Sequence, residues 1–322
     1  MGSPKTAATM PSKAKMSSRR SSLSFKASLP AGPLLMLASA FLFSVCDGLI
    51  KLMGPAFRTW DIAFYRFGFG LVILVGILGW KGNPFKTDNL KLMIIRGITG
   101  SFAFLSLVTA IRLIPISTTM VLFFSFPAFA ALFSFLIFGE RISKGEIICI
   151  LGALLGASIL FEYQIAGNLF GQAAGLLSGV FAGLTVCFIK RLRETNGAVV
   201  IYLYFCLLGA LISFPGFISQ PQLPRFGIEW LMTGGIVFTS MAAQLLMNQG
   251  FQYCKSWEGS LLLTSEVVFT SMLGIVFLGE MVSWRFGIGG LLIVGSALFI
   301  NLAKVRKISA HPGDESQRVT IA

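Results

Sequence analysis

Apolar residues occur in long runs over most of the chain, and short polar or Gly- and Pro-containing segments separate these runs. Each run has roughly 18 to 24 residues, which is enough for an α-helix to cross about 30 Å of hydrocarbon. The separators are too short to hold a soluble domain. The pattern predicts an all-α integral membrane protein with ten transmembrane helices, at residues 33–53, 61–80, 92–113, 117–138, 145–162, 170–190, 198–218, 229–252, 258–278 and 284–304.

The chain also repeats itself with a shift of 140 residues. The segment 117–143 resembles the segment 257–283, and the same shift aligns Gly139 with Gly279, Glu140 with Glu280, Phe41 with Phe181, and Ser125 with Ser265. A duplicated half is typical of many secondary transporters. We therefore predict a basic tail, a first five-helix repeat, a second five-helix repeat and a C-terminal tail, at residues 1–30, 31–163, 170–304 and 305–322.

Basic residues predict the direction in which the helices cross. With the N-terminus inside, fourteen Lys or Arg of the loops and C-terminal tail, Arg96 among them, fall on the cytosolic side and five on the outer side. Short loops rich in Lys and Arg stay in the cytosol. Both termini are therefore predicted to be cytosolic, and an odd number of helices per half makes the second repeat inverted relative to the first.

Composition supports a membrane protein. Apolar residues make up 55% of the chain, charged residues 12%, and the mean hydropathy is +0.81, whereas soluble domains carry about 25% charged residues. The lipid bilayer is thus an expected partner. The net charge of +13 is mostly an orientation signal, so no nucleic-acid partner is expected. Residues 1–30 hold six Lys or Arg and no acid, which fits a disordered cytosolic tail and leaves organelle targeting open.

Several motifs together resemble one known family. They are an early Lys, an Arg in the second helix (FYRFGFG, Arg66), a Pro within the fourth helix (FSFPAFAALF, Pro127), and a Gly-Glu pair ending the fourth and ninth helices. Residues 31–304 resemble the EamA type of the drug/metabolite transporter superfamily. The runs FSVCDGLIKLMGP, FYRFGF and IRGITG are similar to the branch that contains S-adenosylmethionine carriers, and riboflavin and amino-acid carriers share the scaffold. The second repeat departs from the pattern, with Val267 where the first has Pro127.

Three charged residues lie near the outer ends of the first two helices. Asp47 and Lys51 are four residues apart on one face of the first helix, and Arg66 lies about six residues inside the second. A charge inside a helix costs about 2.5 to 3.5 kcal/mol on insertion scales unless it finds a partner or water. At a rise of about 1.5 Å per residue, Asp47 and Arg66 reach similar depths. We predict an Asp47–Arg66 pair with Lys51 at its rim, which either serves as an outer gate or only fixes the two helices together.

Glu266 is the candidate for solute or proton binding. It lies near the middle of the ninth helix, and Gln244 and Asn248 share one face of the eighth helix at about the same depth. A carboxyl group with amide neighbours in a dry cavity suits a group that takes and releases a proton. Ser125, the counterpart of Ser265, belongs with these candidate substrate- or proton-binding residues. The alternative is a protonated Glu266 that only joins two helices by hydrogen bonds.

Proline, glycine and the Gly-Glu pairs predict local geometry. Pro127 frees a backbone carbonyl and permits either a hinge or a static kink. Glycines recur every four residues from Gly171 to Gly183, which favours close helix packing within the chain and leaves a homodimer as the alternative. Glu140 and Glu280 are predicted to cap the helices that follow them.

Enzyme chemistry is not expected. The single His, His311, lies in the polar tail, the five cysteines lack metal-type spacing, and the sequence shows no nucleotide-hydrolysing domain. No cofactor and no metal are therefore predicted. We expect a secondary transporter of the bacterial inner or plasma membrane that moves a small polar or amphipathic metabolite by alternating access. Proton coupling stays open, and a non-transporting scaffold or receptor is the main alternative.

Overall fold

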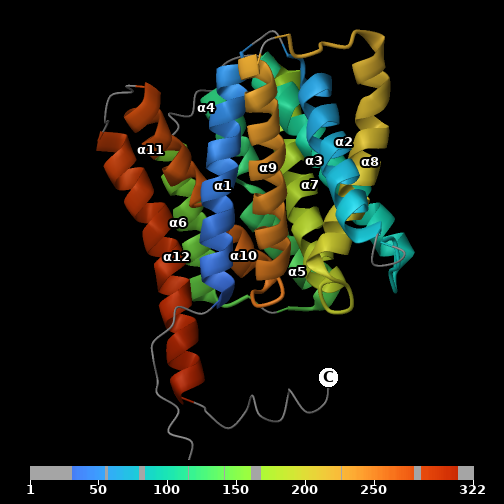
Figure 1. Ribbon diagram of the computed structural model, residues 1–322. Coiled ribbons are helices and arrows are strands. Elements are labelled where there is room, and N and C mark those ends of the chain that lie inside the picture. The colour runs from blue at the N-terminus through green and yellow to red at the C-terminus, as the bar shows by residue number, and fades with distance from the viewer. Residues whose placement is uncertain are drawn as a thin grey trace, which may run out of the picture.

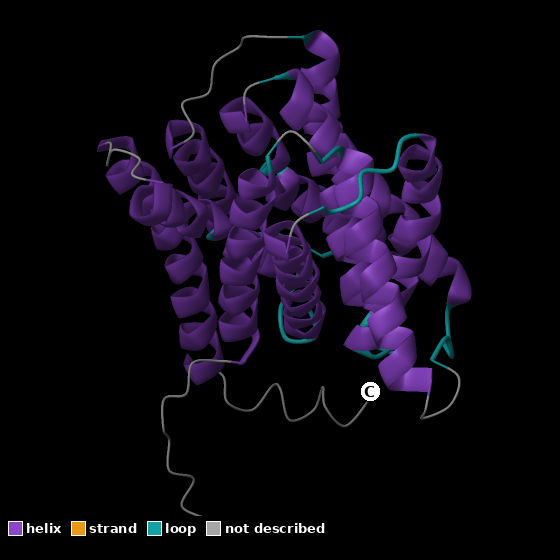
Figure 2. Ribbon diagram, turned by 45° about the horizontal axis from the view of Figure 1, so that its top comes forward, coloured by secondary structure: helices purple, strands orange, loops and turns teal. Residues whose placement is uncertain are grey.

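The computed structural model describes residues 31–54, 57–79, 84–114, 116–140, 142–160, 168–225, 227–278 and 284–310. Every regular element in these ranges is an α-helix, and the long helices run roughly side by side in one bundle (Figures 1 and 2). The predicted tail 1–30 and residues 311–322 of the predicted tail 305–322 lie outside the described residues, whereas residues 305–310 continue the last helix of the chain.

The first repeat supplies six of these helices. They are α1 Ala31–Met53, α2 Thr59–Gly79, α3 Leu90–Leu113, α4 Ile116–Phe123, α5 Phe126–Phe138 and α6 Lys144–Leu160. The second repeat supplies α7 Leu169–Leu192, α8 Ala198–Ser219, α9 Gly227–Gly250, α10 Ser256–Leu263, α11 Glu266–Leu278 and α12 Trp284–Ala310.

The described helices differ from the ten predicted runs at two places. The runs 117–138 and 258–278 are each divided into two helices, α4 with α5 and α10 with α11. The bounds of the second pair are those of the first pair shifted by 140 residues, so both repeats break at the same position.

Seven segments of the described chain are long and apolar enough to cross a membrane. They are Ala31–Ile50, Thr59–Gly79, Leu90–Ala110, Thr119–Phe138, Leu169–Leu192, Ala198–Ser219 and Gly227–Gly250. Large apolar side chains also remain exposed on the outer faces of α2, α6 and α12, as a lipid-facing surface requires. The protein is therefore a multi-pass integral membrane protein.

The most extensive helix contacts join the two repeats. Helix α1 packs along α9, α3 along α7, α2 along α8, and α6 along α12. In Figure 1, α1 and α9 lie together at the centre of the bundle, while α11 and α12 stand at one side and α2 and α8 at the other. The repeats thus share one interior rather than folding as separate bodies.

The glycine row of α7 packs inside the chain as predicted. A Cβ atom added to Gly183 would lie 2.7 Å from Phe129 Cβ and 2.8 Å from the backbone nitrogen of Ala130. One added to Gly179 would lie 2.6 Å from Ser125 Oγ. Because these neighbours belong to the break between α4 and α5 and to α5 itself, the glycines let that discontinuous helix approach α7 closely.

The Gly-Glu pair of the first repeat ends α5 in a way that the sequence did not predict. Gly139 adopts a φ of 65°, a left-handed conformation that favours glycine at a helix C-terminus. The Glu140 carboxylate then turns back and accepts a hydrogen bond from the Ser134 hydroxyl. At the start of α6, it is Glu146 that accepts a hydrogen bond from the backbone of Ser143, so the predicted capping role of Glu140 is wrong. Glu280 lies outside the described residues.

The two ends of the bundle pack differently. Helices α5 and α10 contact each other near the end of the bundle at which α1 begins and α9 ends, whereas α4 and α11 have no comparable contact among the described residues. Figure 1 shows α4 and α11 toward one end and α5 and α10 toward the other. The repeats are therefore related in their bounds and in most of their helix pairings, and they differ in the contact between α5 and α10.

Candidate functional site

The break between α10 and α11 places a carboxyl group inside the bundle. Helix α10 ends at Leu263, Thr264 and Ser265 form a turn, and Glu266 is the first residue of α11. The first turn of any helix leaves backbone N–H groups without helical acceptors, and the helix dipole favours negative charge there. The break thus provides a polar position where a continuous apolar helix would have none.

Asp47 is the nearest acidic partner of Glu266. Helix α1 packs against α11, and the two carboxyl groups lie within hydrogen-bonding reach of each other. Both residues are partly exposed although they come from interior faces of the bundle. A hydrogen bond between two carboxyl groups requires that one of them holds a proton.

Arg66 stands close to these acids but does not pair with them directly. Its guanidinium group lies 5.0 Å from the centre of the Phe104 ring and 5.7 Å from that of Phe67. It acts electrostatically on Asp47 and Glu266, yet no ion pair of the described residues joins it to either. The predicted Asp47–Arg66 contact is therefore replaced by Asp47–Glu266, and the Lys51 side chain lies outside the described residues.

The two amides predicted to accompany Glu266 have other neighbours. Asn248 is fully buried, and its Nδ2 donates a 3.1 Å hydrogen bond to the backbone oxygen of Ala198 at the start of α8. Gln244 is buried with its Nε2 4.0 Å from the sulfur of Met247. Among the described contacts, neither amide reaches Glu266. Asn248 joins α9 to α8, and the predicted trio is not assembled.

Ser125 and Pro127 lie at the corresponding break in the first repeat. The Ser125 hydroxyl donates a 2.5 Å hydrogen bond to the backbone oxygen of Leu122. Pro127 is buried in the first turn of α5, where its missing N–H costs nothing. The predicted kink is therefore a complete break between α4 and α5. No acidic residue lies in this break, in contrast to Glu266 at the second one.

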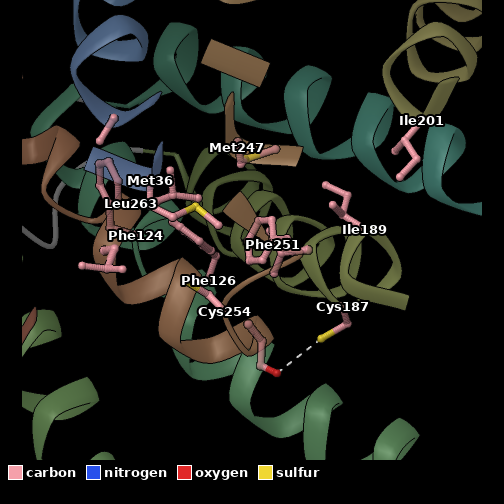
Figure 3. Close-up of a cluster of buried hydrophobic side chains, with 14 of the residues drawn as sticks. Met36, Phe124, Phe126, Cys187, Ile189, Ile201, Met247, Phe251, Cys254 and Leu263 are labelled. Carbon is pink, nitrogen blue, oxygen red and sulfur yellow. Dashed lines mark hydrogen bonds between the residues drawn. The ribbon is translucent and has the colours of Figure 1, made fainter. Parts of the chain in front are cut away.

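An apolar cluster fills the bundle between the first break and α10. Figure 3 shows Phe124 and Phe126 beside Met36 and Leu263, with Met247, Phe251 and Cys254 from α9 and the turn after it. On the far side of the cluster, the Cys187 sulfur lies 3.4 Å from the backbone oxygen of Ala130. This cluster gives the end with α5 and α10 a dense apolar core.

One buried charge escaped the sequence prediction. Arg96 was counted among the cytosolic basic residues, but its side chain is fully buried and none of its three nitrogen atoms has a hydrogen-bond partner among the described residues. The guanidinium group lies 4.1 Å from the centre of the Phe205 ring. Its position in the second turn of a predicted span was the available signal, since an orientation signal belongs outside the membrane.

Comparison with known proteins places the chain among transporters. The model of the EamA-like transporter family matches residues 30–162 and again residues 169–302. The chain is 25% identical to the pseudopaline exporter CntI of Pseudomonas aeruginosa over 277 residues, which cover 86% of this chain and 98% of the exporter. It is 23% identical to human solute carrier family 35 member G1, over 81% of this chain and 76% of that protein.

A solved crystal structure supports the fold independently. It superimposes with a TM-score of 0.73 over 86% of this chain and 98% of the other chain, at 20% sequence identity. Because two successive family matches cover the helical part of the chain, and because their boundaries fall on the two repeats described above, the protein belongs to the EamA-like transporter family.

Proposed function

We propose that this protein is a secondary active transporter that exports a small polar or amphipathic organic solute. The observation that carries the proposal is the Asp47–Glu266 carboxyl pair at an interior helix break. Polar groups inside a membrane bundle typically mark solute or ion pathways. Discontinuous helices commonly form the binding sites of transporters. The name of the Pseudomonas aeruginosa relative supports export as the direction.

The proposed mechanism is alternating access in ten membrane spans arranged as two inverted five-helix repeats. In this proposal, α4 with α5 forms one span and α10 with α11 another, and both termini lie in the cytosol of a bacterial inner or plasma membrane. The contact of α5 with α10, without a comparable described contact of α4 with α11, supports a state closed at one end only. The two breaks, at Ser125 with Pro127 and at Thr264 with Ser265, would act as hinges.

The proposed role of Glu266 is to exchange a proton with the solute or the solvent. Asp47 lies beside it and Arg66 acts on both from α2. A carboxyl pair that shares one proton can release it when a cationic group of the solute binds or when the site opens to the solution on the other side of the membrane. Gln244, Asn248 and Ser125 then support the surrounding helices, and a homodimer remains compatible with this scheme.

Reconstitution tests the proposal directly. Purified protein in liposomes is assayed for uptake and counterflow of labelled amino acids, S-adenosylmethionine and riboflavin, with and without a pH gradient. Saturable counterflow of one compound supports a carrier, and acceleration by the gradient supports proton coupling. Absence of counterflow for every compound, in vesicles whose protein melts cooperatively, would favour the scaffold or receptor alternative.

A further inference from the structure

A second group of buried polar atoms lies away from the Asp47–Glu266 pair. Arg96 of α3 has no hydrogen-bond partner for Nε, Nη1 or Nη2. Tyr202 of α8 has none for its hydroxyl, and Arg66 of α2 has none for Nε, among the described residues. Arg96 and Tyr202 are each 0% exposed, and Arg66 is 7% exposed. Three helices thus direct unpartnered polar atoms into the interior.

Aromatic rings connect the members of this group. The Arg96 guanidinium lies over Phe205 and the Arg66 guanidinium over Phe104. Phe67 lies between them, with ring centres 4.9 Å from Phe205 and 5.7 Å from Phe104. Cation–π contacts stabilise a guanidinium, but they satisfy none of its N–H groups.

Glycines leave room for these side chains. A Cβ atom on Gly100 would lie 2.9 Å from the Phe205 ring and 3.5 Å from Arg96 Nη1, and one on Gly70 would lie 3.3 Å from the Tyr202 hydroxyl oxygen. At these two positions, a side chain larger than glycine would therefore crowd the polar atoms or the rings beside them. Glycine at positions 70 and 100 thus leaves space for the aromatic rings and the polar side chains of this group.

The unpartnered atoms share one chemical property. A guanidinium only donates hydrogen bonds, and a phenol readily donates one. An isolated buried charge is costly, and a planar guanidinium matches the two oxygens of a carboxylate. The missing partner is therefore an acceptor that carries negative charge, and no ion pair of the described residues supplies it to Arg96.

We propose that Arg96, with the Tyr202 hydroxyl and Arg66 Nε, forms a subsite for a carboxylate group of the transported solute. The inference rests on the proposed transport function and specifies its substrate. The Asp47–Glu266 pair accommodates a cationic or proton-donating group, and Arg96 binds the anionic one. The solute class is then a zwitterionic organic acid whose apolar or aromatic part contacts Phe67, Phe104 and Phe205.

The ligand reaches this subsite through movement of the helices. Arg96 is fully enclosed in the described state, and Thr99, one turn further along α3, accepts a hydrogen bond from Thr185 of α7 at 3.0 Å. Separation of α3 from α7 and α8 would open the site to one side of the membrane. Binding of a carboxylate then stabilises whichever state encloses it.

The test compares acids with their neutral amides. Purified protein in detergent is melted with acetate or acetamide, benzoate or benzamide, and glycine or glycinamide, with inorganic phosphate as a further anion. At least one carboxylate is expected to raise the melting temperature saturably by about 2 to 4 °C, since a ligand of the folded state stabilises it. Its amide should raise the temperature by less than a quarter of that shift.

Variants connect the shift to the subsite. Arg96→Leu should abolish the carboxylate shift, and it should raise the melting temperature without ligand because an unpaired buried charge is removed. Tyr202→Phe, which removes one hydroxyl, should at least halve the shift and serves as the readout if Arg96→Leu does not fold. Arg225→Gln alters an exposed loop residue and should retain the full shift.

Two results would overturn the subsite. The first is that no carboxylate raises the wild-type melting temperature, whether or not phosphate raises it. The second is that a carboxylate raises the melting temperature of Arg96→Leu by as much as that of the wild type. The transport assay separates this failure from that of the proposed function. Counterflow of a solute without any carboxylate shift removes only the subsite, whereas a carboxylate shift without counterflow leaves the subsite and removes transport.

Discussion

The two helix breaks have the same position in their repeats and different chemistry. In the first, Ser125 precedes Phe126 and Pro127, and the buried ring of Phe126 joins the apolar cluster. In the second, Ser265 precedes Glu266 and Val267, and the carboxyl group of Glu266 lies beside Asp47. Repeats can thus retain a backbone discontinuity while one copy serves packing and the other carries the acid.

The partners of the breaks differ in the same sense. Helix α7 meets the first break through the small residues Gly179 and Gly183. Helix α1 has Ser39 and Phe43 at the corresponding positions, and it carries Asp47 one turn further on. The first break therefore packs closely against a backbone, and the second faces a polar side chain. A substitution at the first break should chiefly change stability, and one at the second should chiefly change transport.

Removing the acid at the second break should have the largest effect. Glu266→Gln retains the shape of the side chain and cannot exchange a proton, so we expect transport to fall at least about tenfold, equivalent to about 1.4 kcal/mol. The remaining rate should lose its response to a pH gradient. Counterflow in liposomes with inside and outside buffers of different pH measures both quantities.

Glu194→Gln is the matched control, because Glu194 is an exposed acid that pairs with Arg191 at the end of α7. It should transport as the wild type does. Wild-type rates and an unchanged pH response in Glu266→Gln would remove Glu266 from the transport cycle and leave the two breaks functionally alike.

Crowding the first break should chiefly affect stability. A Cβ atom at Gly183 would lie 2.7 Å from Phe129 Cβ, 2.8 Å from Ala130 N and 2.9 Å from Phe126 O. Two of these neighbours are backbone atoms and cannot rotate away, so Gly183→Ala should destabilise the protein by about 1 to 3 kcal/mol. A melting curve in detergent records the loss.

Gly287→Ala provides the comparison in α12, since nothing lies within 4 Å of its added Cβ. Alanine favours a helix by up to about 1 kcal/mol over glycine, so this variant should melt at or slightly above the wild-type temperature. If Gly183→Ala melted at the same temperature as Gly287→Ala, α7 would be free to move away from α5.

A proline at the second break should show whether the two breaks share a backbone geometry. Val267 corresponds to Pro127, and its N–H donates a 3.1 Å hydrogen bond to Thr264 O. Val267→Pro loses that bond, at a cost of about 1 kcal/mol. Met272→Pro, inside α11, should cost about 3 kcal/mol or more. Equal losses in the two variants would show that the chain is not broken at Thr264 and Ser265 in the membrane.

The positions of most helices could be predicted from the sequence, because hydrophobic run length depends on residues close together in the chain. The helix breaks could not. At Thr264 and Ser265 the residues are compatible with a continuous helix, and the break becomes visible only from the backbone. Pro127 did mark the first break, but a proline predicts a kink as readily as an end of a helix.

The candidate site was predicted in part for a related reason. Counting residues along a helix gives depth, and depth placed Asp47 near Arg66, and Glu266 near Gln244 and Asn248. It does not give the rotation of each helix about its axis, which decided that Asp47 meets Glu266 and that Asn248 meets Ala198. Arg96 was missed because a basic residue near a helix end fits the orientation rule equally well.

The smallest expected effect concerns Pro127 as a hinge. Pro127→Ala restores an N–H in the first turn of α5, where no helical acceptor is required, so the stability should change by less than about 1 kcal/mol. A hinge needs a helix break that persists through the transport cycle. With alanine at position 127, α4 and α5 can form one continuous helix in one state of that cycle. We therefore expect about a threefold lower counterflow rate with an unchanged half-saturating solute concentration. Unchanged rate and stability together would make Pro127 a static element and leave hinge motion to the second break.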